Sequence, residues 1–512
     1  MNWAKVHRPA LLAGALAAAA TAAGCMVGPD FKQPPAPDVK GYTREPLPVA
    51  TTASKVAAGD AQRFIEDRDI PGEWWTLFHS PQINSLIEQA LQKNPSLQAA
   101  QASLRQAQEN VYAEEGVLLP KADLNAQSTR EQISGATFGA PRAIGPFSIH
   151  TASVSVSYPL DVWGGTRREV ESLAAQADYQ RFQLEAAYLT LTSNVVLAAV
   201  QEASLRAQIS ATQDIIQIES DQLDVLRQQF DLGGTSRVAV LAQEATLAQT
   251  RATLPTLEKQ LAQQRNLLAV LAGRFPSDEP QETFDLAKLT LPQDLPLSLP
   301  SKLVEQRPDV RSAEETLHST SAQIGVATAA MLPQITLTGS WGRTATQPSG
   351  LGSPANAVWS YAAGLTQPLF HGGQLLHQKR AAVAAFDSAA AQYRNTVLSA
   401  FQNVADTLRA LESDANALAA QVEAERSALD SLTLQRQQYQ FGAITYTSLL
   451  NAEQTYQQAH INLVQAQANR FADTAALFQA LGGGWWNRAD VTAEGTAQAD
   501  TFTKVLDRSV RQ

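Results

Sequence analysis

Residues able to do chemistry are sparse in this sequence, and their spacing fits no catalytic or metal-binding motif. His371 and His377 lie six residues apart, off the i, i+4 spacing that sets two histidines on one helix face for a metal ion. His318 and His460 stand alone in helical sequence, where surface or packing roles are expected. No glycine pair is followed by Lys-Ser/Thr, as a phosphate-binding loop requires. We therefore expect neither an enzyme nor a bound cofactor or metal.

The chain contains one cysteine, Cys25, so an intrachain disulfide is excluded and the position of the thiol becomes informative. Residues 1–24 combine early basic residues with an apolar run, which is the pattern of a signal peptide too short to span a membrane in the mature protein. The small residues before Cys25 resemble a bacterial lipobox, in which the thiol is diacylated after cleavage. Ala22 replaces the usual leucine, so an ordinary signal peptide with an incidental cysteine remains the alternative. Met26 follows Cys25 at the position where a signal for retention in the inner membrane has aspartate. The resemblance therefore favours location in the outer membrane.

The composition limits the function classes. Charged residues make up 17%, below the roughly 25% of soluble domains, which suggests that much helix surface is packed. The net charge of −10 argues against nucleic-acid binding. After residues 1–24 no run of 18 apolar residues occurs, so we expect no transmembrane helix in the mature chain.

The chain is a tandem repeat of two units of roughly 210 residues. The stretch QQFDLGGTS over 228–236 is matched by QQYQFGAIT over 437–445, and Glu244 is matched by Glu453 at the same offset. Two prolines 25 residues apart, Pro95 and Pro120, recur as Pro308 and Pro333. Two copies are too few for an extended solenoid, which needs at least three repeats. The copies must therefore pair within one domain, or the chain must oligomerise.

Each repeat predicts one continuous long helix and a second rod made of two shorter helices. The stretches 166–232 and 374–441 lack proline and glycine, and each would form a helix of about 100 Å. After each turn a helix follows, over 236–272 and 447–481, and Pro255 should kink the first of these. A helix over 95–118 stacked end to end with 236–272 nearly equals one long helix in length.

Short polar-apolar alternation between the prolines predicts strands with one apolar and one small polar face. The turn-rich segments 133–147 and 344–357 would link them as hairpins. A soluble sandwich shows the same alternation, but strands of this kind also suit a transmembrane barrel. Four strands cannot close a barrel and an open edge cannot face lipid, so several chains would have to contribute. The predicted strands cover 121–128, 150–158, 334–342 and 358–367.

Ordered motifs from Cys25 to about Trp486 resemble the lipoprotein branch of the TolC-like outer membrane efflux proteins. The matching stretches are CMVGPDF from Cys25, the Trp74-Trp75 to Asn94-Pro95 segment, YPLDVWG from Tyr158, RPDVRSAE from Arg307 and LGGGW from Leu481. The resemblance implies an α+β membrane protein: a homotrimer with a 12-stranded β-barrel in the outer membrane, four strands per chain, continued by a 12-helix periplasmic α-barrel. A belt around it would draw on Gly72–Ser80, Phe275–Pro300 and the C-terminal segment.

The resemblance also implies where partners bind. Each repeat would give one hairpin to the β-barrel and one helix pair to the tunnel, and the two matched turns would be the tips that meet a periplasmic adaptor and an inner-membrane pump of the RND type. Glycine suits these turns because it tolerates positive φ, which is also sufficient reason for an ordinary turn glycine. The tip residues are Leu232, Gly233, Gly234, Thr235, Phe441, Gly442, Ala443, Ile444 and Thr445.

The entrance constriction of the family would lie in Leu450-Asn451-Ala452-Glu453-Gln454, where the family usually has Leu-Asp-Ala-Gln-Arg. The missing aspartate and arginine put a charged gate in doubt. Thr447, Asn451 and Gln454 share one helix face and could form a neutral, hydrogen-bonded constriction, with ordinary packing as the alternative.

The expected domains are a signal peptide (1–24), a first efflux repeat with an N-terminal belt segment (25–300), a second repeat (301–486) and a disordered tail (487–512). The expected function is a passive outer membrane channel of a tripartite efflux system, exporting drugs or other small molecules, lipid-anchored in a Gram-negative bacterium. A non-channel scaffold lipoprotein and a periplasmic adaptor are the alternatives.

Overall fold

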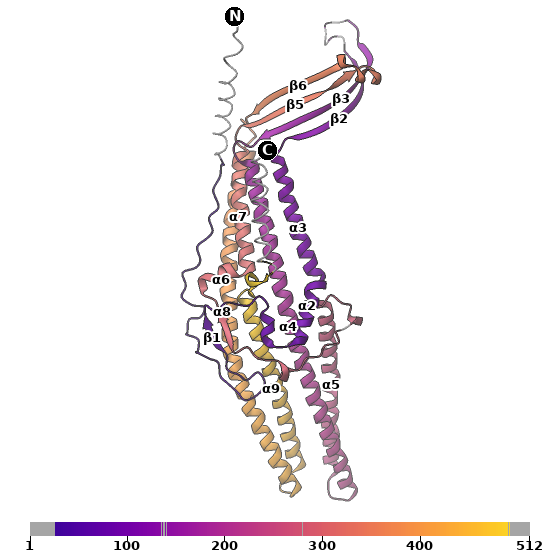
Figure 1. Ribbon diagram of the computed structural model, residues 1–512. Coiled ribbons are helices and arrows are strands. Elements are labelled where there is room, and N and C mark those ends of the chain that lie inside the picture. The colour runs from indigo at the N-terminus through magenta and orange to yellow at the C-terminus, as the bar shows by residue number, and fades with distance from the viewer. Residues whose placement is uncertain are drawn as a thin grey trace. The chain divides into compact units, whose positions relative to one another are not determined.

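The chain forms two compact units (Figure 1). A computed structural model describes residues 26–134, 136, 139, 141–278, 280–489 and 491. Unit 1 comprises the described parts of 1–34, 103–181 and 312–394, and unit 2 those of 35–102, 182–311 and 395–512. The expected signal peptide, Cys25 and the tail from residue 492 lie outside the described residues. Within the described part of the chain, no helix combines the length and the hydropathy needed to cross a membrane.

The two long helices, and the helices that follow the two turns, are confirmed to within one residue at either end. The expected helix over 95–118 ends earlier, at Glu115, and a 3₁₀ helix covers Gly116–Leu118. Helices α4 (Gly165–Asp231) and α8 (Gln374–Gln440) have 67 residues each. Each is followed by a helix of 35 residues, α5 (Arg237–Leu271) or α9 (Tyr446–Ala480). Helix α5 continues through Pro255. The remaining helices are α2 (Pro81–Lys93), α3 (Pro95–Glu115), α6 (Pro300–Gln306) and α7 (Pro308–Ala329).

Within unit 2, a residue that precedes one helix contacts the end of another helix in each repeat. Asn94, just before α3, donates its side-chain amide to the carbonyl of Leu271 at the end of α5, at 3.0 Å. Arg307, just before α7, donates from Nη1 to the carbonyl of Ala480 at the end of α9, at 2.9 Å. A side chain at one helix start thus satisfies an orphan carbonyl at another helix end.

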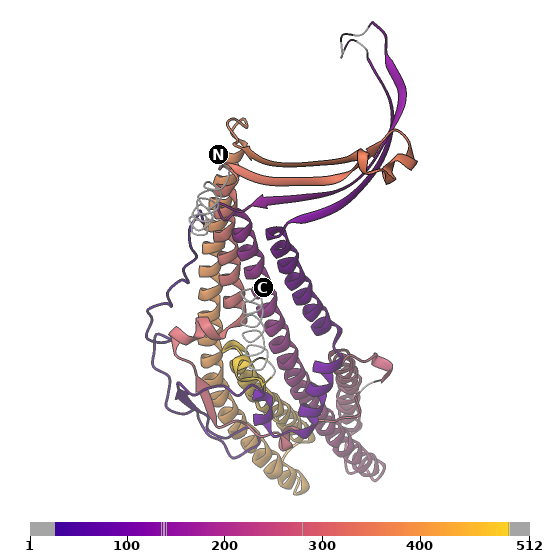
Figure 2. The same ribbon diagram turned by 45° about the horizontal axis from the view of Figure 1, so that its top comes forward.

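Four antiparallel strands form one curved sheet in unit 1, in the order β2-β3-β5-β6 (Figure 2). They are β2 (Lys121–Ile133), β3 (Ile144–Leu160), β5 (Gln334–Ala345) and β6 (Ala357–Thr366). Both hairpins are confirmed, but the expected linker 133–147 is wrong in extent, because β3 already begins at Ile144. Backbone pairing runs to Glu131↔Phe147 and, after a register shift, ends at Ile133↔Ile144. It extends into the turn-rich stretch because the backbone ladder does not depend on side-chain polarity.

The strand register produces the two faces that the alternation predicts. Across the sheet, Leu124 is opposite Val154, which is opposite Trp341, and Trp341 is opposite Trp359. The neighbouring row carries Asp123, Ser155, Ser340 and Ser360, and the last two hydroxyls are 3.0 Å apart. All four apolar side chains of the first row are exposed in the single chain. One sheet face is therefore apolar and uncovered.

The belt segments pack together in unit 2, as expected. Trp74 stacks on Phe478 of α9 with ring centroids 5.3 Å apart. The backbone amide of Thr290 donates to the carbonyl of Phe78, at 3.1 Å. A pairing that the sequence analysis missed joins β1 (Arg63–Glu66) and β4 (Asp294–Leu297) in parallel.

The fold extends past the expected start of the tail at residue 487. Asn487 donates its side-chain amide to the carbonyl of Ile70, at 2.8 Å. Arg488 pairs with Glu185 at 2.7 Å, with both side chains more than nine-tenths buried, and lies over the ring of Tyr188. These two residues are therefore part of unit 2.

Candidate functional site

The two matched turns of unit 2 have the same backbone geometry, although they lie 209 residues apart. After α4, the amides of Gly233 and Gly234 donate to the carbonyls of Phe230 (2.9 Å) and Gln229 (2.7 Å). After α8, the amides of Gly442 and Ala443 donate to Tyr439 (2.9 Å) and Gln438 (2.8 Å). This pair of bonds is the Schellman helix ending, which requires a residue in the left-handed region. Both turns therefore end a helix by the same device.

The helix that follows each turn also begins in the same way. The hydroxyl of Ser236 accepts from the amide of Ala239, and that of Thr445 accepts from the amide of Ser448, both at 3.3 Å. Side-chain oxygens at these positions cap the unpaired amides of a helix start. Each turn is thus fixed at both sides by local bonds, and we call the two turns, over 232–235 and 441–445, the tips.

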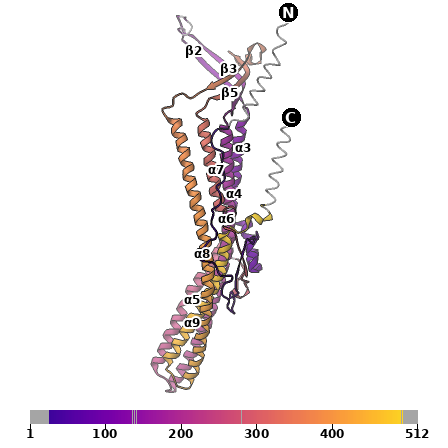
Figure 3. The same cartoon turned by 90° about the vertical axis from the view of Figure 1, so that its left-hand side faces the viewer.

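Both tips present an apolar side chain to solvent. Leu232 and Phe441, which are repeat equivalents, are 86% and 87% exposed. A Cβ on Gly233 or Gly442 would meet nothing within 4 Å. Figures 1 and 3 show both tips at the same end of unit 2. An exposed apolar pair at the end of two capped hairpins is suited to contact with another protein.

The candidate constriction residues lie on the outside of α9. Thr447, Asn451 and Gln454 are all exposed, whereas Leu450 and Glu453 between them are buried. The three polar side chains therefore face away from the core that α4, α5, α8 and α9 share. The leucines of that core are Leu223, Leu226, Leu247, Leu432, Leu449 and Leu450.

A buried polar network joins the two helix pairs behind the tips. Gln222 of α4 donates to the Glu453 carboxylate of α9, and Tyr446 of α9 donates to the side-chain oxygen of Gln243 of α5. Gln243 in turn donates to the backbone carbonyl of Glu219, at 2.8 Å. The first two bonds run from one helix pair to the other, and the third holds Gln243 within its own pair. They fix the relative rotation of the pairs because a buried amide or hydroxyl without its partner is costly.

Two carboxylates in this network are incompletely paired. Oε2 of Glu219 and Oε2 of Glu453 are buried and lack a hydrogen-bond partner among the described residues. Burial raises the pKa of both carboxyls, and the nearby Glu453 charge raises the pKa of Glu219 further. The network is therefore most stable when these acids carry a proton.

Sequence reasoning paired Glu453 with Glu244 as repeat equivalents and missed that only Glu453 is buried. Each forms an ion pair with an equivalent arginine: Glu244 with Arg227 at the surface, at 2.8 Å, and the buried Glu453 with Arg436, at 3.5 Å. In the sequence, only the hydrophobic residues near Glu453 could have indicated that this side chain is buried. These residues are Leu449, Leu450 and Ala452.

The candidate lipidation site, Cys25, precedes a segment that is fixed to unit 1. We call Met26–Pro34 the strap. The amide of Val27 donates to the carbonyl of Trp163, at 3.0 Å. Gly28 crosses Gly325 of α7 so closely that an added Cβ would lie 2.4 Å from the Gly325 Cα. Met26 lies against Gly164, four residues after β3 ends. The chain next to Cys25 thus runs beside the strand-bearing end of unit 1.

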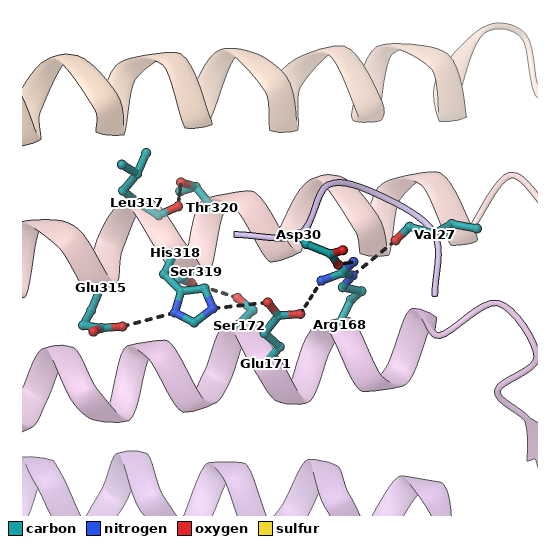
Figure 4. Close-up of polar contacts among 10 residues, drawn as sticks. All are labelled: Val27, Asp30, Arg168, Glu171, Ser172, Glu315, Leu317, His318, Ser319 and Thr320. Carbon is teal, nitrogen blue, oxygen red and sulfur yellow. Dashed lines mark hydrogen bonds and ion pairs between the residues drawn. The ribbon is translucent and has the colours of Figure 1, made fainter. Parts of the chain in front are cut away.

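Arg168 of α4 holds the strap by two contacts and is itself paired with a glutamate of its own helix (Figure 4). Its guanidinium pairs with Asp30 at 2.6 Å and with Glu171 at 2.7 Å, and Nε donates to the carbonyl of Val27 at 3.3 Å. The Arg168 side chain is only 2% exposed. The charge-assisted bonds stabilise the buried cation and fix the strap. Sequence analysis did not identify Arg168, since Asp30 lies 138 residues away from it.

His318, for which a surface or packing role is expected, packs in unit 1, where its ring contacts glutamates from two helices and Phe31 of the strap. The other lone helix histidine, His460, lies 3.3 Å from Glu425. Among the described residues, no three His, Cys, Asp or Glu side chains gather in a way that could hold a metal ion.

About nine-tenths of the chain is similar to known efflux proteins. It is 28% identical to the probable efflux pump outer membrane protein SepC of Pseudomonas putida, over 91% of this chain and 95% of the relative. It is also 28% identical to the probable outer membrane lipoprotein SilC of Salmonella typhimurium, over 90% of this chain and 96% of the relative.

Solved outer membrane channels have the same fold. The outer-membrane channel OprN matches with a TM-score of 0.81 and 26% identity, over 90% of this chain and all of that one. The MtrE outer membrane channel of Neisseria gonorrhoeae, solved in an open state, matches with a TM-score of 0.76 and 27% identity, over 90% of this chain and 99% of that one. These channels combine a helical barrel with a β-barrel, so the fold of this chain is that of a TolC-like outer membrane channel.

The family model for outer membrane efflux proteins matches residues 86–274 and 299–483, which is most of the chain. Its relatives are transport proteins of the outer membrane that extend into the periplasm, which leaves neither a scaffold lipoprotein nor an adaptor as an alternative. The chain therefore belongs to the outer membrane efflux protein family and is the outer membrane channel of a tripartite efflux system.

Proposed function

We propose that the channel is a homotrimer in which three sheets close one twelve-stranded β-barrel and the helices of three chains form a twelve-helix periplasmic barrel. One observation carries this proposal: the order β2-β3-β5-β6 leaves β2 and β6 with a partner strand on one side only among the described residues. Unpaired edge groups cannot face lipid, and single-chain bacterial barrels have at least about eight strands. Closure by three copies would pair every edge and turn the apolar face towards lipid.

The two repeats, over 25–300 and 301–486, would each contribute one strand hairpin and one helix pair to this assembly. The tips would contact a periplasmic adaptor and, through it, an inner-membrane pump of the RND type. Their exposed Leu232 and Phe441 support this assignment. Cargo would pass through the trimer passively, as drugs or other small molecules, while the pump supplies the work.

The exposed face of α9 would line the inner entrance. Thr447, Asn451 and Gln454 are uncharged, so three copies would form a neutral ring rather than one closed by ion pairs. Hydrogen bonds between amide and hydroxyl side chains of neighbouring chains would hold that ring.

Cys25 would carry the lipid that inserts into the outer membrane. One acyl chain binds a membrane only marginally, so stable attachment needs further contacts. The strap supplies a firm connection from this residue to unit 1 through Arg168 and Asp30.

Two measurements on the purified protein test the assembly. Its mass in detergent should correspond to three chains, and it should conduct ions in planar lipid bilayers. A folded monomer that conducts ions would refute the trimer. A trimer that conducts no ions would refute the pore, if variants with a charged residue in place of Asn451 conduct none either.

A further inference from the structure

His318 of α7 lies at the meeting point of two helices and the strap in unit 1. Its Nε2 is 3.2 Å from Oε1 of Glu171 on α4, and its Nδ1 is 3.3 Å from Oε2 of Glu315 on α7 (Figure 4). The imidazole is stacked on the ring of Phe31, with centroids 4.3 Å apart and planes at 15°. One ring thus touches a carboxylate on each side and an aromatic ring on its face.

The protonation state of this ring decides how many of these contacts are favourable. The imidazolium has two N–H donors and can bond both carboxylates, whereas the neutral ring has one donor and turns a lone pair towards the other carboxylate. A cation over an aromatic face is also attracted by the ring quadrupole. Loss of the proton therefore weakens both the interhelical bridge and the stacking on Phe31.

The surrounding charges favour the imidazolium. Those that act on His318 are Glu315 on its own helix and Glu171 on α4. The strap contributes Asp30, which is paired with Arg168, and Arg168 also bonds the second oxygen of Glu171. The α3 side chains that line the groove beside Glu315 are neutral: Ser103, Gln106, Ala107 and Asn110.

We propose that His318 is a proton-operated latch for the second half of the strap. When protonated, it holds Phe31 against α4 and α7. When neutral, it releases Phe31 and the residues that follow, up to Pro34, while Arg168 continues to hold Val27 and Asp30. The strap therefore has one attachment that responds to pH, at His318, and one that does not, at Arg168.

The direction of the pH effect follows from the linkage of proton binding to the closed strap. The hydrogen bond to Glu315, followed by that to Glu171, raises the pKa of His318 above its ordinary value of 6.5. The latch is therefore fully closed below the ordinary pKa and is lost as the pH rises through the raised one. This range overlaps the interval in which histidine switches act.

Lys32 makes the latch testable, because it is exposed and adjoins Phe31. The purified channel in detergent would be digested with a lysine-specific protease, and fragments would be quantified by mass spectrometry. Cleavage after Lys32 reports opening of the strap, and cleavage after Lys288, 81% exposed in unit 2, is the reference in the same digest. The Lys32-to-Lys288 ratio should rise about three- to tenfold between about pH 6 and about pH 8.5, the size expected for two partly exposed ion pairs.

In His318→Gln the ratio should be high and independent of pH. His460→Gln is the matched control, because His460 also lies beside a glutamate and stacks on Tyr456, but in unit 2, and it should behave as the unmodified protein. Glu315→Gln should shift the midpoint to lower pH. A ratio that stays constant in the unmodified protein, or that rises equally in His318→Gln, would overturn the latch. If His318→Gln does not assemble, an unshifted midpoint in Glu315→Gln overturns it.

Discussion

Gly233 and Gly442 hold the same left-handed backbone conformation, with φ of 76° and 68°, each at the end of a 67-residue helix. Equivalent hydrogen bonds and equivalent hydroxyl caps, Ser236 and Thr445, surround them, and an equivalent apolar side chain precedes each. The two turns therefore have the same shape, and each exposes an apolar side chain. Such a pair is suited to bind a partner that presents the same binding surface more than once.

Replacing Gly442 with tryptophan should disable pump coupling while assembly survives. The added side chain meets open space, so only the positive φ opposes it, at a cost of about 1–2 kcal/mol confined to the turn. Trimer yield and membrane location should stay normal, crosslinking to the adaptor should fall, and cells lacking the native channel should remain sensitive to exported compounds. Gly233→Trp should act in the same way, more weakly if only one of the two docking grooves is strictly required.

Gly116→Trp is the matched control for bulk, because a Cβ there also meets nothing within 4 Å and the residue lies in unit 1. It should retain resistance. Full resistance and normal crosslinking in a Gly233→Trp, Gly442→Trp double variant would show that the tips are not the docking surface.

Cys25→Ser should abolish incorporation of radioactive palmitate. The variant contains no thiol, and Arg168 holds the strap through Asp30 and Val27, so folding and assembly should be retained. Asp30→Asn weakens the hold of Arg168 but keeps the thiol, and it should be labelled normally. Undiminished labelling of Cys25→Ser would refute the lipid attachment.

Glu453→Gln should stabilise the helix pairs more at alkaline than at acid pH. Burial raises the pKa of the Glu453 carboxyl, so its favourable contribution is present below the ordinary pKa and is lost as the pH rises through the raised value. Glutamine does not ionise, so the variant does not lose this contribution as the pH rises. Between about pH 5 and about pH 8 its advantage in unfolding free energy should grow by on the order of 1 kcal/mol, followed by circular dichroism on heating.

Glu244→Gln is the repeat-matched control. Its carboxylate is paired with Arg227 at the surface, so the substitution should change stability by less than about 1 kcal/mol, without the growth at alkaline pH. Equal pH profiles for the two variants would contradict a buried Glu453.

Arg488→Ala should destabilise unit 2 strongly, by about 3–5 kcal/mol, because it breaks the ion pair between two side chains that are both more than nine-tenths buried. The same change removes the guanidinium that lies 3.6 Å from the ring centre of Tyr188. Adding Glu185→Gln should recover part of the loss in thermal unfolding. A double variant no more stable than Arg488→Ala would show that the buried charge is not the cause.

The sequence alone determined the elements whose formation is local. The lengths of α4 and α8 follow from the absence of proline and glycine, and the tips follow from Gly233 and Gly442, the residues that end a helix in the left-handed region. The apolar row through Val154 and Trp341 follows from period-two alternation, since side-chain direction in a strand alternates whatever the partner. Family membership followed from motifs spread in order along the chain.

Tertiary structure decided what depends on distant partners. Glu244 and Glu453 occupy equivalent positions in the two repeats, yet one lies at the surface and the other in the core, because burial is set by the helices that pack against each. His318 gains its second carboxylate and its aromatic contact from residues 147 and 287 positions away, a pairing that no local pattern encodes. The parallel pairing of β1 with β4 likewise depends on segments that meet only in the folded chain, where their backbone groups satisfy one another.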